Sequence, residues 1–269
     1  MSTLDKGHRS IEVHRHADGV IRVASDQVAA EVPVALVYNG ISHVVMMVTP
    51  DDLEEFALGF SLTEGIIESA EELYEAEIVE TDNGIELQLT ISERRFQALK
   101  EWRRNLTGRT GCGLCGAESL EQVIQLPQPL SVGEPIVAAA IGKAMARLQD
   151  YQPLNQRTGA THAAAWADSE GNIIAVCEDV GRHNALDKLI GTLSRRQRPE
   201  GFLIVTSRAS YEMIQKAGWA NMGLIAAVSA PTSLAIELAE KLNITLLGFA
   251  RDNNFVCYAN HQGVAEITS

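Results

Sequence analysis

The sequence predicts an α/β protein, with a three-layer α/β/α domain at its C-terminal end and a smaller α+β domain before it. After His162, short apolar runs alternate with amphipathic helical segments, a pattern typical of parallel strands covered on both faces. The N-terminal half instead carries two hairpin signals, Asn39-Gly40 and Asp82-Asn83-Gly84. The stretch "QLPQPLSVGEP" holds three prolines in eleven residues and predicts a boundary between domains at 1–126 and 127–269.

The N-terminal half is expected to form two hairpins and three helices. Thr49 is a candidate cap for the first helix, with Pro50 in its first turn, and Ser92 is a candidate cap for the second. The expected elements are a hairpin over 32–48, a helix from Thr49, a hairpin over 76–91, a basic helix over 93–106 and a short helix over 117–126.

The C-terminal half is expected to open with a helix over about 134–150, followed by two strands joined at residues 169–172. Helices and strands then alternate to the end of the chain. The expected helices are 183–195, 210–221 and 231–243, and the expected strands are 161–168, 172–179, 201–207, 223–230, 244–250 and 255–260.

Composition narrows the class of protein. The net charge of −13 argues against a nucleic-acid-binding protein, which would present a basic field. No apolar run is long enough to span a membrane, and the polar N-terminus does not resemble a secretory signal. We therefore expect a cytoplasmic protein with no membrane association. Its four cysteines are too few for a disulfide framework in a chain of 269 residues.

The pair Cys112 and Cys115, in "GCGLCG", is the strongest chemical signal. A structural zinc ion needs four ligands, and Cys177 and Cys257 lie in apolar runs where cysteine is usually a buried hydrophobe. A thioredoxin-like motif would follow a strand, whereas here a basic helix precedes it. The flanking glycines favour a third interpretation, a nucleophilic thiol on an accessible loop over 107–116.

A basic block precedes the thiols. Between Ser92 and Gly111, six cationic side chains face only Glu93 and Glu101: Arg94, Arg95, Lys100, Arg103, Arg104 and Arg109. Charge alone favours a solvated helix face. The alternative is a surface that guides an anionic ligand or an acidic partner.

Polar residues also follow several predicted strands of the C-terminal half. Arg182, His183 and Asn184 start a helix, where free N–H groups favour anions, whereas Asp187 and Lys188 are expected on its solvent side. Because ligands of open α/β sheets bind at the carboxyl ends of strands, these loops predict a site for a phosphate-bearing ligand. The other candidates are His162, Arg208, Ser229, Thr232 and Arg251. No Walker A motif is present, and the G-x-G-x-x-G spacing of "GCGLCG" follows a predicted basic helix and not a strand, which argues against an ordinary ATP or NAD site.

The blocks "GCGLCG", "EDVGRHNALDKLIG", "SRASYEMIQKAG", "SAPTSLAIELAEKLNITLLGFAR" and "TGATHAA" resemble the formate dehydrogenase accessory sulfurtransferase family of FdhD/NarQ type, from about Val32 to the C-terminus. The resemblance implies a cytoplasmic homodimer whose C-terminal domain is similar to the cytidine deaminase fold. It also implies a persulfide relay, in which a cysteine desulfurase donates sulfur to the thiol loop. The sulfur then passes to a bis(guanine dinucleotide) pterin cofactor of molybdenum or tungsten, before this enters formate dehydrogenase.

The resemblance also implies roles for residues. Cys112 would carry the persulfide, with Cys115 as its assistant, and GDP should bind as a fragment of the cofactor. The guanine dinucleotide would be lined by Phe249, Ala250, Arg251, Asp252, Asn253 and Asn254. Ala160 departs from the family pattern, which often has a second glycine there.

Two other functions stay open at this point. One is a zinc-dependent, deaminase-like hydrolase that uses Cys112, Cys115 and a histidine, although the family's deaminase-like fold lacks zinc ligands in the required order. The other is a cofactor chaperone without catalysis, in which the two cysteines are structural. Fold alone does not decide between them.

Overall fold

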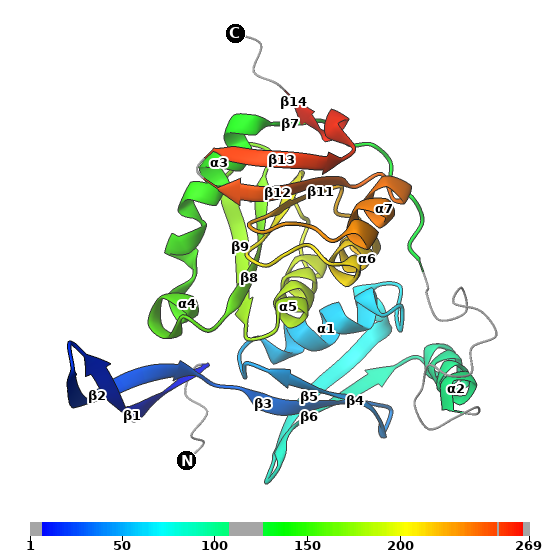
Figure 1. Cartoon of the computed structure of the whole chain (residues 1–269). Helices are drawn as coiled ribbons and strands as arrows, with labels where there is room; N and C mark the ends of the chain where they lie inside the picture. Colours follow the sequence, from blue (N-terminus) through cyan, green and yellow to red (C-terminus); the bar gives the residue numbers. More distant parts are fainter. Residues whose placement is uncertain (1–6, 108–125, 252, 266–269) are drawn as a thin grey trace.

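The computed structural model describes residues 7–107, 126–251 and 253–265 (Figure 1). A mixed sheet of six strands forms its centre, in the order β13-β12-β11-β10-β8-β9. Its three middle strands, β12, β11 and β10, are parallel, and the others are antiparallel to their neighbours. The strands are β8 (His162–Asp168), β9 (Ile173–Asp179), β10 (Gly201–Val205), β11 (Leu224–Ala227), β12 (Thr245–Arg251) and β13 (Asn254–Ala259).

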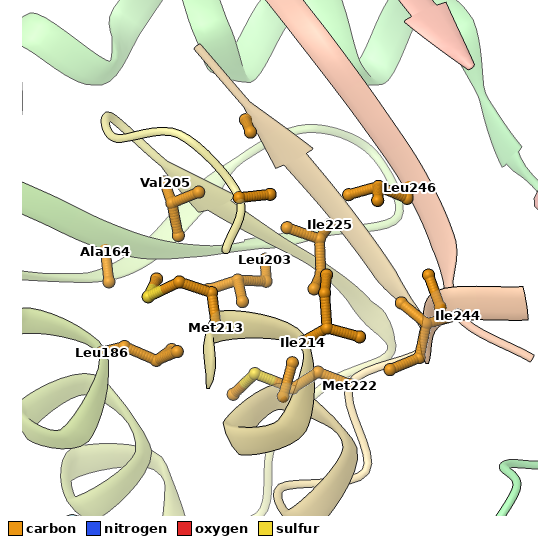
Figure 2. Close-up of a cluster of buried hydrophobic side chains, with 14 of the residues drawn as sticks. Ala164, Leu186, Leu203, Val205, Met213, Ile214, Met222, Ile225, Ile244 and Leu246 are labelled. Carbon is orange, nitrogen blue, oxygen red and sulfur yellow. The ribbon is translucent and has the colours of Figure 1, made fainter. Parts of the chain in front are cut away.

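Helices cover both faces of this sheet. Along β10, alternate side chains enter two different cores: Leu203 and Val205 pack with α5, α6 and α7, whereas Phe202 and Ile204 pack with α3. Figure 2 shows Leu203 and Ile225 directed toward Met213 and Ile214 of α6. The helices are α3 (Ala138–Arg147), α5 (Arg182–Ser194), α6 (Tyr211–Trp219) and α7 (Ser233–Lys241).

A second sheet has the strand order β4-β3-β6-β5 and packs against α1 (Leu53–Thr63). Its strands are β3 (Val32–Tyr38), β4 (Ile41–Val48), β5 (Leu73–Thr81) and β6 (Gly84–Ile91). Both predicted hairpins are confirmed. At the first turn, Asn39 and Gly40 have φ of 45° and 81°, the two positive values that a type I′ turn requires.

The two sheets are joined where α1 crosses α5 (Figure 1). A Cβ atom at Gly59 would lie 1.7 Å from the carbonyl oxygen of Asp187, and one at Gly191 would lie 1.9 Å from that of Glu55. The helix backbones are therefore in direct contact, which only glycine at these two positions permits.

The remaining elements lie around these layers. An N-terminal hairpin, β1 (His8–Ala17) and β2 (Val20–Ala29), projects from the body of the molecule in Figure 1 and was not predicted. The others are α2 (Glu93–Thr107), α4 (Pro153–Thr158), β7 (Ile136–Val137) paired with β14 (Val264–Ala265), and the 3₁₀ turns Ala70–Glu72, Leu148–Tyr151 and His261–Gly263.

The predicted α/β class and the order of elements from β8 to β13 are confirmed, whereas β7, α4 and β14 were not predicted. The expected start of α1 at Thr49 is wrong, because Thr49 bonds to a residue of β9 and the helix begins at Leu53. Ser92 does cap α2, since its hydroxyl accepts the backbone N–H of Arg95. The helix expected over 117–126 lies almost entirely outside the described residues. The division at residue 127 and the likeness to cytidine deaminase stay predictions.

Candidate functional site

The carboxyl ends of β10, β11 and β12 meet at one edge of the six-stranded sheet. Arg208 follows β10, Ser229 and Thr232 follow β11, and Arg251 ends β12. His162 reaches the same edge from the antiparallel strand β8, in which Ala164 is paired with Val205 of β10. The structure therefore brings sequence-distant candidates to one edge of the sheet.

Hydrogen bonds join the loops at this edge into one surface. The N–H of Thr232 donates to the carbonyl of Ala209 (3.0 Å), and that of Phe249 donates to the carbonyl of Ser229 (3.3 Å). The guanidinium of Arg251 donates to the carbonyl of Val228 (3.1 Å). The loops after three adjacent strands are thus held together, with the exposed side chain of Arg208 among them.

The positive charge of Arg182 affects two histidines of the candidate site. Partial burial lowers the pKa of His162, and the positive charge of Arg182 lowers it further. The same two causes, in the same order, lower the pKa of His183. Both imidazoles are therefore neutral at pH 7, and the arginine supplies the local positive charge. A neutral histidine can donate one hydrogen bond to a phosphate. Because it is uncharged, it adds no second positive charge beside Arg182 when the ligand is absent.

Three buried polar atoms near this edge lack a hydrogen-bond partner in the part of the chain that the structure describes: Arg182 Nε, His183 Nε2 and Tyr211 Oη. His183 Nε2 lies 3.6 Å from the carboxylate of Glu212, too far for a hydrogen bond. Because an unsatisfied buried donor is costly, these atoms mark where a ligand would be stabilised. Tyr211 was not predicted, since a tyrosine at a helix start is usually part of the core.

Phe249 is unusual in its backbone. Its φ is +52° and its side chain is 44% exposed, at a bulge between Gly248 and Arg251. A left-handed conformation is rare for a bulky residue and is most often kept at functional sites. Its neighbour Ala250 is buried, and Asn253 packs against α3 at Gly142. Asn254 is paired with Arg251 in the strand register, and Asp252 lies outside the described residues.

Asn184 has a different position from the one expected. It is buried, and its amide donates to the carbonyl of Met47 (2.8 Å) and to Asp179 Oδ1 (2.9 Å). The structure therefore assigns this amide to internal contacts and does not support a contact with the cofactor.

The expectation that Asp187 and Lys188 face solvent is wrong. Their exposed fractions are 1% and 0%. Lys188 pairs with Asp179 (2.8 Å) and Asp187 pairs with Lys216 (3.0 Å). The partners lie on other elements, so the sequence near α5 does not reveal them.

Cys112 and Cys115 lie outside the described residues. Cys177 is buried as expected, and burial raises the pKa of its thiol to about 11. Cys257 is exposed, so its expected burial is wrong.

In the basic block, Arg94 and Arg95 form ion pairs with acidic residues of the preceding 3₁₀ turn region, Glu68 and Glu72. The acidic residues within the block are therefore not the only anions beside these two arginines. Local sequence did not show that the chain brings the acidic segment back beside α2.

Among the residues with described positions, no group of three histidine, cysteine, aspartate or glutamate side chains could hold a metal ion. Within the same residues, none of the helices has the length and apolar character needed to cross a bilayer.

Comparisons with known proteins converge on one family. The model of the FdhD/NarQ family matches residues 29–265. A sulfur carrier protein FdhD from Cupriavidus necator is 53% identical over 257 residues, covering 95% of this chain and 89% of the relative. Another, from Xanthomonas euvesicatoria pv. vesicatoria, is 52% identical over 252 residues, covering 93% and 90%.

A solved structure shows the same fold. It belongs to a protein from Desulfotalea psychrophila named as a formate dehydrogenase accessory protein, and it aligns with a TM-score of 0.77. The alignment covers 97% of this chain and 100% of that chain at 22% identity, a level at which the likeness concerns the fold alone.

Proposed function

Since the chain belongs to the FdhD/NarQ family, we infer that it is a sulfur carrier required for formate dehydrogenase activity. We further propose that it acts as a sulfurtransferase in a cytoplasmic homodimer. Its sulfur donor would be a cysteine desulfurase, and its client would be formate dehydrogenase. The family match and the names of the relatives support the carrier role, and the motif "GCGLCG" supports a thiol as the carrier.

The transfer would begin at Cys112. Its thiolate attacks the terminal sulfur of a persulfide held by the desulfurase, and the sulfur–sulfur bond of the donor breaks. The donor cysteine leaves as a thiolate, and Cys112 now carries the persulfide, so no oxidant or reductant is consumed. Cys115 would assist, and the flanking glycines keep bulk away from both sulfurs.

The acceptor would be the bis(guanine dinucleotide) pterin cofactor of molybdenum or tungsten, bound as cargo. We place its guanine dinucleotide at the carboxyl edge of β10, β11 and β12. The observation that carries this placement is the pair of buried atoms Arg182 Nε and His183 Nε2, which have no hydrogen-bond partner among the described residues. Charged diphosphate would satisfy both donors, and the exposed ring of Phe249 offers a flat surface to a base. His162, Arg208, Ser229, Thr232 and Arg251 would complete the site.

GDP tests this site without the whole cofactor. It should raise the melting temperature of the protein, since a ligand at about 100 times its Kd stabilises the folded state by about 2.7 kcal/mol. The shift should shrink at high salt and in Arg182→Ala. Arg196→Ala, an exposed arginine beyond the other end of α5, is the matched control. Equal stabilisation by ADP would leave only a nonspecific phosphate site.

Mass spectrometry tests the carrier. After incubation with a cysteine desulfurase and cysteine, the intact protein should gain sulfur, and Cys112→Ala should not. Cys115→Ala should retain part of the activity in supporting formate dehydrogenase. Full support by Cys112→Ala would contradict the assignment.

A further inference from the structure

Asp179, at the end of β9, is a fully buried carboxylate that accepts four hydrogen bonds and forms one ion pair. Its Oδ1 accepts from the N–H of Gly181 (2.8 Å) and from the amide of Asn184 (2.9 Å). Its Oδ2 accepts from the N–H of Thr49 (2.9 Å) and the hydroxyl of Thr49 (2.8 Å), and it forms an ion pair with the ammonium of Lys188 (2.8 Å). Both oxygens are thus fully used within the protein.

The two bonds to Oδ1 enclose the start of α5. One holds Gly181 immediately before the helix, and the other holds Asn184 in its first turn. Arg182 and His183 lie between these two points. An aspartate that bonds to the N–H two residues later stabilises a turn, so the path of the chain into α5 is set by this side chain.

The contacts of Oδ2 hold the turn against the N-terminal sheet. They also offset the negative charge of the Asp179 carboxylate. Thr49 follows β4, so the turn is fixed against the N-terminal sheet. Lys188 also donates to the hydroxyl of Thr49 (2.7 Å) and is itself fully buried. A cation this close offsets the negative charge of Asp179, which would otherwise oppose an anion bound by Arg182.

We propose that Asp179 is a positioning residue, which fixes the β9–α5 turn so that Arg182 and His183 face an anionic ligand. Lys188 neutralises the carboxylate, so the turn is held without repelling that ligand. The inference rests on the proposed function only for the identity of the ligand, which we represent by GDP.

Asp179→Asn is the direct test, with Asp187→Asn as the matched control. Asp187 is a similarly buried, ion-paired carboxylate on α5, but its hydrogen bonds go to Thr63 and Lys216 and not to the start of the helix. Both variants should lose stability. By titration calorimetry, Asp179→Asn should bind GDP about tenfold more weakly, equal to about 1.4 kcal/mol, and Asp187→Asn should bind it as the wild type does.

A second variant keeps the test valid if Asp179→Asn folds poorly. Asp179→Asn combined with Lys188→Met removes both charges and should recover stability without recovering GDP affinity.

NMR titration adds a measurement that needs no ligand. The pKa of His162 should fall in Asp179→Asn, since the carboxylate raises it, and should not change in Asp187→Asn.

The possible results distinguish the proposed nucleotide site from the positioning role of Asp179. A wild-type protein that does not bind GDP would refute the proposed nucleotide site. Wild-type binding that is unchanged in Asp179→Asn, or lost equally in Asp187→Asn, would overturn the positioning role alone.

Discussion

Replacing Lys216 by methionine should reveal what the buried ion pair behind the site contributes to stability. The ammonium of Lys216 donates to both oxygens of Asp187 (3.0 and 3.1 Å), to the hydroxyl of Thr63 (2.9 Å) and to Glu64 (3.0 Å). Its side chain is 8% exposed and that of Asp187 is 1% exposed. In Lys216→Met, Asp187 would remain in the core without its cation.

The expected cost at pH 8 is about 3–5 kcal/mol, the range for breaking a buried pair by removing one partner. For a chain of this size, that corresponds to a fall in melting temperature on the order of 10 °C. Glu64→Gln is the matched control, because it breaks only the half-exposed contact of the same lysine. Its expected cost is below about 1 kcal/mol.

The cost should depend on pH. Burial raises the pKa of Asp187 to about 6, and removal of the nearby cation raises it further. A raised carboxyl pKa gives a contribution to stability that is present below about pH 4 and is lost as pH rises through the folded-state value. At pH 5 the carboxyl is therefore largely neutral in both proteins, and the cost of the substitution should fall to about 1–2 kcal/mol of lost hydrogen bonds.

Urea denaturation at pH 5 and pH 8 measures both values. Lys216→Met combined with Asp187→Leu should recover most of the loss at pH 8, since no bare charge remains buried. A cost below about 1 kcal/mol at pH 8, or an equal cost at both pH values, would refute this account of the ion pair.

Three other changes test separate features. Gly191→Ala should cost about 2–3 kcal/mol in urea denaturation, because its Cβ would lie 1.9 Å from the carbonyl of Glu55; Gly133→Ala, with open space around it, should change little. His183→Gln should flatten the loss of stability as pH falls below about 6.5: burial and Arg182 lower the folded-state pKa of His183, so the unfolded chain takes up the proton first. An unchanged slope would show that His183 is not the group responsible. Phe249→Gly should leave the melting temperature equal or higher, since glycine accepts a φ of +52°, while GDP binding weakens. A fall in both would mean that the ring is a packing residue.

Local patterns were enough to predict the hairpins and the C-terminal alternation. Asn39-Gly40 specifies its turn through the two residues themselves, and "GFLIVTS" is a buried strand by its composition alone. The convergence of Arg182 and Arg208 followed from a general property of strands that run in the same direction, that their carboxyl ends share an edge, whereas His162 reaches this edge from the start of the antiparallel strand β8.

Several wrong expectations share one physical cause, a partner that local sequence does not show. Asp187 and Lys188 look like solvent-exposed residues on a helix, because the residues that pair with them belong to α6 and β9. Thr49 looks like a helix cap, yet its hydroxyl bonds to Asp179. The N-terminal hairpin was missed because charged and histidine side chains interrupt its apolar alternation in "HRSIEVHRHA". Sequence periodicity records local structure, whereas Thr49 and Asp187 are bonded to residues 130 and 29 positions away.

The same distances along the chain determine the order of folding during synthesis. Thr49 is 130 residues before Asp179, and Thr63 is 153 residues before Lys216. At about 5–20 residues per second, a ribosome needs roughly 6–25 s to supply the first of these partners. Until α5 has been synthesised, the α5-facing side of α1, including Gly59, has no helix to pack against. The contacts that bury the N-terminal half can therefore form fully only after the second half has been translated.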